Sequence, residues 1–390
     1  MSSTTDINIL FLDKLDGVEQ PWDLLYEGNT YWSSDYLKVM NDFPPYDVAT
    51  HYALVKKGEI PVAKFTFQFL SIKLSESFGD TKEQFTFPQK IQNGIKNLIL
   101  PFLNFNLVVS GNTLLSGNYG YFISAELASG EKSEILMDVV QQYKLFLKKK
   151  KLKADGILMK DFEDPEAIYG DKLKADNFTH FSIQPKMRLD LSEGWKVMDD
   201  YLAALKSKYR VRYKRARKKF EGLEKRDLQY EDLEQYKSDM YNTYRKTVDQ
   251  ASFNLFLLHE DYFVALHRAL GDKIKIVGIF EGDELIAFYT LVINNGEIDA
   301  HYLGYDVDKN HNYQLYLNML YYMVEDSISS SMNVLHMSRT ALEIKSSIGA
   351  TPENINLYAK HYNSVLNSLV PSVLRITVPE VEWMPRSPFK

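Results

Sequence analysis

Cationic and polar side chains suited to an anionic ligand gather at several places in this sequence. Residues 206–219 read KSKYRVRYKRARKK and contain no acidic residue. On a helix, like charges four residues apart repel each other, so this segment needs acidic partners in the fold or an anionic ligand. We expect Arg210, Arg212 and Arg215 to contact a phosphate-bearing ligand. The alternative is a solvated helix balanced by the acidic residues that follow it.

A second candidate is the segment of residues 306–314, DVDKNHNYQ, which joins an expected strand to an expected helix. A helix N-terminus presents free N–H groups and the positive end of the helix dipole, which suits a phosphate. The side chains that we expect to bind a cofactor here are Lys309, His311, Asn312 and Gln314. The alternative is an ordinary strand-to-helix loop, capped by Asp308 or Asn310.

His301 is the candidate for proton transfer. It lies in an expected strand in which Glu297, Asp299 and His301 share one face, because side chains alternate across a strand. Polar residues on a central strand indicate the floor of a site, where a histidine can take a proton from an amine. The alternative is a structural histidine held by hydrogen bonds.

Arg339 follows the short apolar run of residues 334–337. Ligands of open α/β sheets bind at the carboxyl ends of strands, and a buried arginine needs an anion from the protein or from a ligand. Lys345 lies one or two helical turns later, where it could serve the same site or be exposed. We expect Arg339 to act in catalysis and Lys345 to contact the cofactor.

The first half of the chain offers similar but weaker candidates. Lys160 and Asp161 stand at the end of an expected strand, and Asn118 and Tyr119 lie in a polar, aromatic turn. We expect these four residues to contact substrate, with purely structural roles as the alternative. The sequence has no Walker loop, GxGxxG, HExxH or GxSxG motif, so nucleotide hydrolysis, dinucleotide redox chemistry and serine hydrolysis have no support.

The elements that must position these residues occur in the same order twice. In the second half we expect three strands, at residues 275–280, 285–293 and 297–303. A polar loop (306–312), a helix (313–327), a strand (334–337) and another helix (341–347) should follow. The first half repeats this order, and GEIPVA at residues 58–63 matches GDELIA at residues 282–287. The pattern predicts a mixed α/β sheet in each of two similar domains, residues 1–190 and 191–390. The second domain opens with the basic helix.

Composition limits the class of protein. The 390 residues, 45% of them hydrophobic, can bury a large core, and the length favours two domains. A net charge of −6 and the absence of cysteine argue against a duplex-DNA binder, disulfides and thiolate metal sites. Residues 1–6 do not resemble a signal peptide, and the apolar stretch of residues 95–109 is too interrupted to span a membrane. We expect a cytoplasmic protein without a transmembrane segment or a metal.

With these residues in view, the chain resembles the tandem-GNAT acyltransferases of the FemAB-like group. The resemblance covers most of the chain and is strongest at three motifs: LKSKYR at residues 205–210 with Arg215, LGYD at residues 303–306, and MSRT at residues 337–340 with Lys345 and the Gly-Ala of residues 349–350. It implies an N-acyltransferase that moves an acyl or aminoacyl group from a thioester or an aminoacyl-tRNA to an amine. At the strand exit we expect Asp306 to act in catalysis and Tyr305 to contact substrate.

The resemblance leaves the donor open. The glycine-containing pyrophosphate loop of simple GNAT acetyltransferases is absent, and NHNYQ stands at residues 310–314. Glycines let backbone N–H groups approach a pyrophosphate closely. An acyl-CoA, an acyl-carrier protein and an aminoacyl-tRNA are therefore all candidate donors. The alternative function is a non-catalytic protein of this fold that binds an acidic partner or a phosphorylated ligand.

Overall fold

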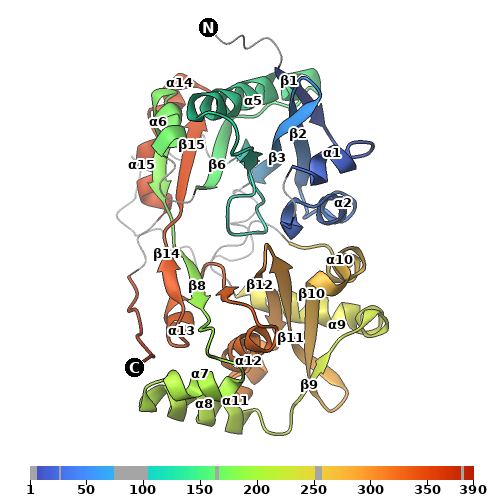
Figure 1. Ribbon diagram of the computed structural model, residues 1–390, viewed down its shortest axis with the longest axis vertical. Helices are drawn as coiled ribbons and strands as arrows, with labels where there is room; N and C mark the ends of the chain where they lie inside the picture. The colour runs from blue at the N-terminus through green and yellow to red at the C-terminus, as the bar shows by residue number, and fades with distance from the viewer. Residues whose placement is uncertain (1–6, 26–27, 74–103, 163–166, 251–256, 379–381) are drawn as a thin grey trace. The chain divides into compact units, whose positions relative to one another are not determined.

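The computed structural model divides into two compact units (Figure 1). It describes residues 7–25, 28–73, 104–162, 167–250, 257–378 and 382–390. Residues 1–6 and most of the apolar stretch 95–109 lie outside these ranges. Unit 1 comprises residues 1–27, 40–183 and 354–380, and unit 2 comprises residues 28–39, 184–353 and 381–390. The domain boundary expected near residue 190 stays a prediction, since compactness alone does not show that a segment folds independently.

Unit 1 is built on a mixed sheet with the strand order β1-β2-β3-β4-β6-β15-β7, and β5 pairs with β3 beside this path. Neighbouring strands are antiparallel, apart from the parallel pair of β4 and β6. The strands are β1 (Ile7–Leu12), β2 (Val48–Lys57), β3 (Ile60–Lys73), β4 (Asn104–Ser110), β5 (Tyr121–Ile123), β6 (Gly156–Phe162), β7 (Thr179–Ser182) and β15 (Asn356–His361).

One face of this sheet packs against a long amphipathic helix. The unit 1 helices are α1 (Glu19–Asp23), α5 (Ser129–Lys149), α6 (Ala167–Ala175), α14 (Ser364–Asn367) and α15 (Val370–Thr377). Helix α2 (Ser34–Asp42) runs across the point where the chain passes from unit 2 into unit 1. The rings of Phe67 on β3 and Tyr143 on α5 stack with centroids 4.0 Å apart. Both residues are fully buried, so the alternation along β3 supplies much of this core.

Unit 2 is built on a second mixed sheet with the order β14-β8-β13-β12-β11-β10-β9. Here the parallel pair is β12 with β13. The strands are β8 (Lys186–Asp190), β9 (Glu224–Asp227), β10 (Ile274–Glu281), β11 (Glu284–Asn294), β12 (Glu297–Tyr305), β13 (Val334–His336) and β14 (Thr351–Glu353). The helices are η1 (Thr30–Trp32), α7 (Met198–Ala204), α8 (Ser207–Lys219), α9 (Tyr230–Asp249), α10 (Tyr262–Leu270), η3 (Gly271–Lys273), α11 (Val307–Tyr313), α12 (Leu315–Ser329) and α13 (Leu342–Ser346).

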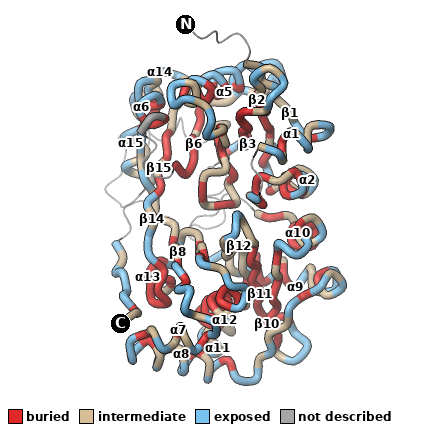
Figure 2. Tube along the Cα trace, in the orientation of Figure 1, coloured by how far each residue is buried: buried red, intermediate tan, exposed pale blue. Residues whose placement is uncertain are grey.

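The core of unit 2 lies between its sheet and α12. Buried residues concentrate in the central strands and in α12 (Figure 2). Apolar side chains of β8, β11, β12 and β13 form one cluster with α12, and Ile298, Leu335 and Leu189 belong to it. Because side chains alternate across a strand, Asp299, His336 and Arg188 lie on the opposite face of the sheet. Helices α9 and α10 pack on strands β10, β11 and β12.

The two sheets have the same pairing pattern, which confirms the predicted fold class of a mixed α/β sheet in two similar halves. The hairpins of β2–β3 and β10–β11 turn at Gly58 and Gly282, with φ of 60° and 63°. The sixth strand of each sheet, counted from β1 or β9, comes from the other half of the sequence. Strand β15 fills this position in unit 1, and β8 fills it in unit 2. The two halves therefore exchange one strand each.

The structure differs from the expected elements at residues 306–312. This segment is not a loop but helix α11, which is seven residues long. Asp306 is its N-cap, since Asp306 Oδ1 accepts hydrogen bonds from the backbone N–H groups of Asp308 and Lys309 at 3.0 and 3.2 Å. The capping residue is therefore Asp306 and not Asp308 or Asn310, the two that the sequence suggested. Within the ranges that the structure describes, no helix is long and apolar enough to cross a membrane.

Candidate functional site

The parallel strands β12 and β13 part soon after they meet. Their ladder contains two residue pairs, Ile298 with Leu335 and Asp299 with His336. Strand β13 ends at His336, while β12 continues to Tyr305 beside β11. We call this divergence the unit 2 fork. Its strands are held apart without breaking the sheet, because β12 pairs with β11 and β13 pairs with β8. Beyond Asp299 no strand of the described residues pairs with this side of β12, although the Tyr305 N–H at its end donates to Thr247 Oγ1 at 3.0 Å. An extended segment of a ligand can pair with a strand edge of this kind.

A strained turn follows β13 at the fork. Three of its non-glycine residues, Ser338, Thr340 and Ala341, have φ of 56°, 68° and 50°. This left-handed conformation costs roughly 1–2 kcal/mol per residue, so other contacts must hold it. Lys345 Nζ donates hydrogen bonds to the carbonyl oxygens of Met337 at 2.5 Å and Arg339 at 2.7 Å. The structure therefore brings Arg339 and Lys345 together in one turn.

Lys345 supplies a buried ammonium to this turn. Only 5% of the residue is exposed, and burial lowers its pKa to about 7. An ammonium carries three N–H donors. Two of them contact Met337 and Arg339, and the third has no partner among the described residues. Lys345 thus combines a structural role with a spare donor at the carboxyl end of β13. Arg339 itself is half-buried.

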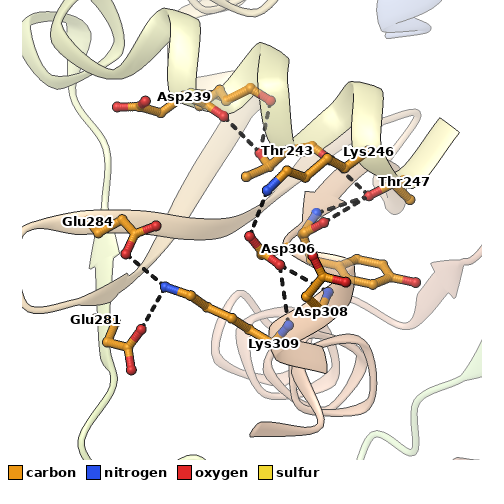
Figure 3. Close-up of polar contacts among 11 residues, drawn as sticks. Asp239, Thr243, Lys246, Thr247, Glu281, Glu284, Asp306, Asp308 and Lys309 are labelled. Atoms are coloured by element: carbon orange, nitrogen blue, oxygen red, sulfur yellow. Dashed lines mark hydrogen bonds and ion pairs between the residues drawn. The ribbon is translucent and has the colours of Figure 1, made fainter. Parts of the chain in front are cut away.

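The predicted phosphate site at α11 is filled by protein carboxylates (Figure 3). Asp306 caps the helix and accepts a hydrogen bond from Lys246 Nζ at 2.7 Å. Burial alone would raise the pKa of Asp306, but the hydrogen bonds from Lys246 and from the Lys309 backbone lower it. Lys309 Nζ donates to Glu281 and Glu284, each at 2.7 Å. These two hydrogen bonds raise the pKa of Lys309.

The other predicted cofactor contacts near α11 have local partners or exposed positions. The backbone carbonyl of His311 accepts a hydrogen bond from Lys219 Nζ at 3.0 Å. Gln314 has a left-handed φ of 50° and joins α11 to α12. Asn312 is exposed, and the burial of Tyr305 raises its pKa. Their roles in binding stay predictions.

His301 lies on β12 among aromatic rings. Its Nε2 is 3.2 Å from the Tyr262 hydroxyl, and its Nδ1 is 3.5 Å from Thr290 Oγ1. Burial lowers the pKa of His301 to about 3, so the imidazole stays neutral at physiological pH and is a weak proton acceptor. Its role as the base stays a prediction.

An acidic residue beside the fork is a stronger proton acceptor, and sequence reasoning did not single it out. Asp299 pairs in register with His336, and His336 Nε2 is 2.6 Å from Glu297 Oε2. Burial is the main cause that raises the pKa of Asp299 to about 6. Asp299 Oδ2 has no hydrogen-bond partner among the described residues. The sequence did place Asp299 on a polar strand face, but nothing local in it could show that His336 would lie opposite.

The predicted substrate residues of unit 1 form a closed arrangement. Lys160 Nζ donates to the carbonyl oxygen of Leu115 at 2.6 Å and forms an ion pair with Asp161. Asp161 Oδ2 accepts a hydrogen bond from the backbone N–H of Gly117 at 2.9 Å. Both charged residues are buried. Asn118 and Tyr119 lie in the loop that this pair ties down, so the structure brings all four residues into one region. Their contact with substrate stays a prediction.

Helix α8 carries the predicted basic surface. Among the described residues, Arg217 is the one α8 side chain in an ion pair, with Glu325 at 3.3 Å. The guanidinium of Arg210 donates to the carbonyl oxygen of Leu205. Arg212 is half-buried and Arg215 is exposed. The acidic residues after the helix therefore do not neutralise its cations. In the part of the chain that the structure describes, no group of three or more His, Cys, Asp or Glu residues could hold a metal ion.

Comparison with known proteins adds a family and a fold. A family model described as FemAB-like, peptidoglycan biosynthesis/recognition, matches residues 126–352. No curated protein matches the sequence. Among solved structures, the crystal structure of FemX has 13% identity and a TM-score of 0.54, over 90% of this chain and 98% of that chain.

Two further structures have the same arrangement. A tandem GNAT protein from the clavulanic acid biosynthesis pathway, solved without AcCoA, has 10% identity and a TM-score of 0.53, over 92% of this chain and 99% of that chain. A conserved protein of unknown function from Bacteroides thetaiotaomicron VPI-5482 has 12% identity and a TM-score of 0.50, over 90% of this chain and 99% of that chain. At such identities the likeness concerns the fold, which is that of two GNAT-like units in tandem.

Proposed function

The chain belongs to the FemAB-like family, whose model matches more than half of it, and we propose that it is an N-acyltransferase. The donor is an acyl or aminoacyl group in thioester or ester linkage. The acceptor is an amine, and the family description makes a peptidoglycan precursor the first acceptor to examine. The observation that carries the proposal is the unit 2 fork. It combines a strand edge that no described strand pairs with, the buried Lys345 ammonium and the half-buried Asp299 carboxylate.

The proposed reaction is a direct transfer. The amine nitrogen attacks the acyl carbonyl carbon, a C–N bond forms, and the C–O or C–S bond to the carrier then breaks. Asp299 accepts the proton that the amine loses, because a carboxylate with a pKa of about 6 is ionised at neutral pH and still has appreciable proton affinity. The spare N–H of Lys345 stabilises the oxyanion of the tetrahedral intermediate. The carrier leaves as an alkoxide or thiolate and takes up a proton.

Two features favour a macromolecular donor over acyl-CoA. The N-terminus of α11 already holds the Asp306 carboxylate, which would repel a pyrophosphate. Helix α8 presents cations that lack acidic partners among the described residues, and such a surface attracts a polyanion such as tRNA or an acidic carrier protein. We therefore place aminoacyl-tRNA first, acyl-carrier protein second and acyl-CoA third. A donor of either of the first two kinds would put the reaction in the cytoplasm.

The experiment is a transfer assay with all three donor classes and an amine-bearing peptidoglycan precursor, with the product identified by mass spectrometry. We expect transfer from aminoacyl-tRNA. The paired change Arg212→Glu and Arg215→Glu should weaken donor binding at low salt, and the difference should shrink as salt rises. Saturable binding of a donor without product under every condition would favour the alternative, a non-catalytic protein that binds an acidic partner.

A further inference from the structure

Strand β3 has an unusual polar face. Its sequence KFTFQF alternates aromatic and polar residues at positions 64–69. Phe65, Phe67 and Phe69 join the hydrophobic core on one face. The other face carries Lys64, Thr66 and Gln68, which we call the β3 polar stripe. An alternating strand of an antiparallel sheet normally turns its polar face to water, yet the exposed fractions here are 0%, 2% and 0%.

Several hydrogen-bonding atoms of this buried region have no partner among the residues that the structure describes. They are the hydroxyl oxygens of Thr50, Thr66 and Thr113 and the amide nitrogen of Gln68. Thr50 is the direct cross-strand neighbour of Gln68, and the Thr113 backbone N–H donates to Gln68 Oε1 at 2.7 Å. That bond defines the orientation of the Gln68 amide, whose NH₂ group has no partner in the described part of the chain. Unsatisfied buried polar atoms are rare and costly in folded proteins. In this region several of them belong to neighbouring residues.

Lys64 adds a buried positive charge to the same face. Its Nζ donates to the carbonyl oxygen of Trp22 at 2.9 Å and lies 5.3 Å from the Trp22 ring centroid. Burial lowers the pKa of Lys64 to about 7, although the nearby Asp23 raises it. An additional anion near Lys64 would favour its charged form, since opposite charges stabilise each other strongly where water is excluded.

The equivalent face of unit 2 has no such feature. Counted from the hairpin glycines Gly58 and Gly282, the stripe positions correspond to Phe288, Thr290 and Val292 on β11. Thr290 Oγ1 donates to the Tyr302 carbonyl oxygen at 3.1 Å and accepts from the Tyr302 N–H at 2.8 Å. The same fold position is therefore apolar and satisfied in unit 2. The unsatisfied polar face belongs to unit 1 and is not a requirement of the fold.

We propose that the β3 polar stripe, with Thr50 and Thr113, binds the oxyanion group of a small ligand, a carboxylate or a phosphate. Hydroxyl and amide N–H groups can donate hydrogen bonds, and the Lys64 charge attracts an anion, so the region suits a guest that supplies only acceptors. Thr50 and Thr113 are partly exposed as residues, so this end of the region lies near the protein surface. This site is a function of unit 1 that the transfer reaction does not require.

The test is calorimetric titration of the full-length protein with sodium acetate and with inorganic phosphate, against sodium chloride at equal ionic strength. We expect saturable binding of at least one oxyanion. Thr66→Val keeps the shape of the side chain but removes its hydroxyl, and should weaken binding roughly tenfold, the equivalent of one hydrogen bond to a charged group. Lys64→Met should weaken it further. Binding to the parent should decline as pH rises above 7, because the anion needs the charged lysine.

The matched control is Thr290→Val, which alters the equivalent threonine of unit 2. It should lower thermal stability, because two hydrogen bonds are lost, and leave oxyanion affinity unchanged. Thr66→Val should be as stable as the parent or more stable, because an unsatisfied hydroxyl becomes a methyl group. If Thr66→Val does not fold, Thr50→Val serves the same purpose. No saturable binding by the parent, or equal affinity in parent and folded variants, would mean that the region holds water alone and would overturn the proposal.

Discussion

Each unit contains a parallel strand pair, and the two pairs differ in the length of their ladder and in the buried charges beyond it. In unit 1 the ladder of β4 and β6 extends over four residue pairs. The Lys160–Asp161 ion pair then ties down the following loop. In unit 2 the ladder has two pairs, and the buried charge beyond it is Lys345, which has no carboxylate partner among the described residues. The same scaffold thus neutralises a buried lysine with a carboxylate beside the β4–β6 pair of unit 1, and keeps the Lys345 charge available at the unit 2 fork.

The largest expected effect is the loss of cooperative folding when the two halves of the chain are separated, because each unit contains a strand from the other half. Residues 1–190 alone lack β15, which pairs with both β6 and β7. Residues 191–390 alone lack β8, which pairs with both β13 and β14. We expect neither fragment to unfold cooperatively in circular dichroism melts, while co-expressed fragments form a folded complex. A cooperatively folded fragment 1–190 would show that β15 is dispensable and would support the predicted boundary.

The next prediction compares the two buried lysines. Lys345→Met should reduce the transfer rate roughly a hundredfold or more, because an oxyanion donor is lost. Lys160→Met leaves the buried Asp161 without its cation, so it should cost about 3–5 kcal/mol of stability. If the role of Lys160 is purely structural, the transfer rate per folded molecule stays unchanged, whereas the predicted substrate contact requires a rate loss. Urea unfolding and single-turnover assays on both variants provide the measurement. A rate loss in folded Lys160→Met as large as that of Lys345→Met would mean that the carboxyl end of β6 takes part in the chemistry.

Asp299 should set the pH dependence of the unit 2 fork. Its pKa is about 6 when folded, compared with an ordinary value of 3.8. The charged groups around it are His336, Glu297 and Lys186. We expect the transfer rate to fall about tenfold per pH unit below pH 6, as the base becomes protonated. Asp299→Asn should be slow and lack this decline. An unchanged profile in the folded variant would exclude Asp299 as the proton acceptor.

The raised pKa of Asp299 also predicts how the free energy of unfolding changes with pH. A carboxyl group whose folded pKa is raised binds its proton more tightly in the folded state. Its contribution to stability is present below about pH 4 and is lost as pH rises through 6. Asp299→Asn should therefore match the parent near pH 4 and be roughly 2–3 kcal/mol more stable at pH 8. Urea titrations at the two pH values measure the difference, and a larger gain at pH 4 than at pH 8 would contradict the assignment.

The smallest effect is expected at the cap of α11. Asp306→Ala removes the N-cap and should cost about 1 kcal/mol, seen as a modest fall in melting temperature. Asp306→Asn keeps an oxygen that can accept from Asp308 and Lys309, so most of the stability should be retained. The same pair of variants examines the predicted catalytic role of Asp306. A transfer rate of Asp306→Asn that falls far more than its stability would confirm that role.

Local patterns predicted much of the fold. Hairpin turns need residues with positive φ, and this marked Gly58 and Gly282 correctly. Alternating and helical periodicities located the strands and the crossover helix, and the repeated order indicated two similar halves. The loop expected at residues 306–312 was wrong because Asp306 starts the helix. Asp306, which directly follows β12, was read as part of the loop, although a capping carboxylate two or three residues before free N–H groups is a local signal.

The rest depended on contacts between residues far apart in the chain. The sequence by itself determined which residues alternate on β3 and β12, which turns carry glycine, and where cations concentrate on α8. Only the tertiary structure decided that β8 and β15 are exchanged, that His336 lies opposite Asp299, and that Lys345 reaches back to the turn at Arg339. It also decided that the polar face of β3 is covered. Strand pairing and burial depend on which distant segments meet, and a period of two along one strand carries no information about its neighbours.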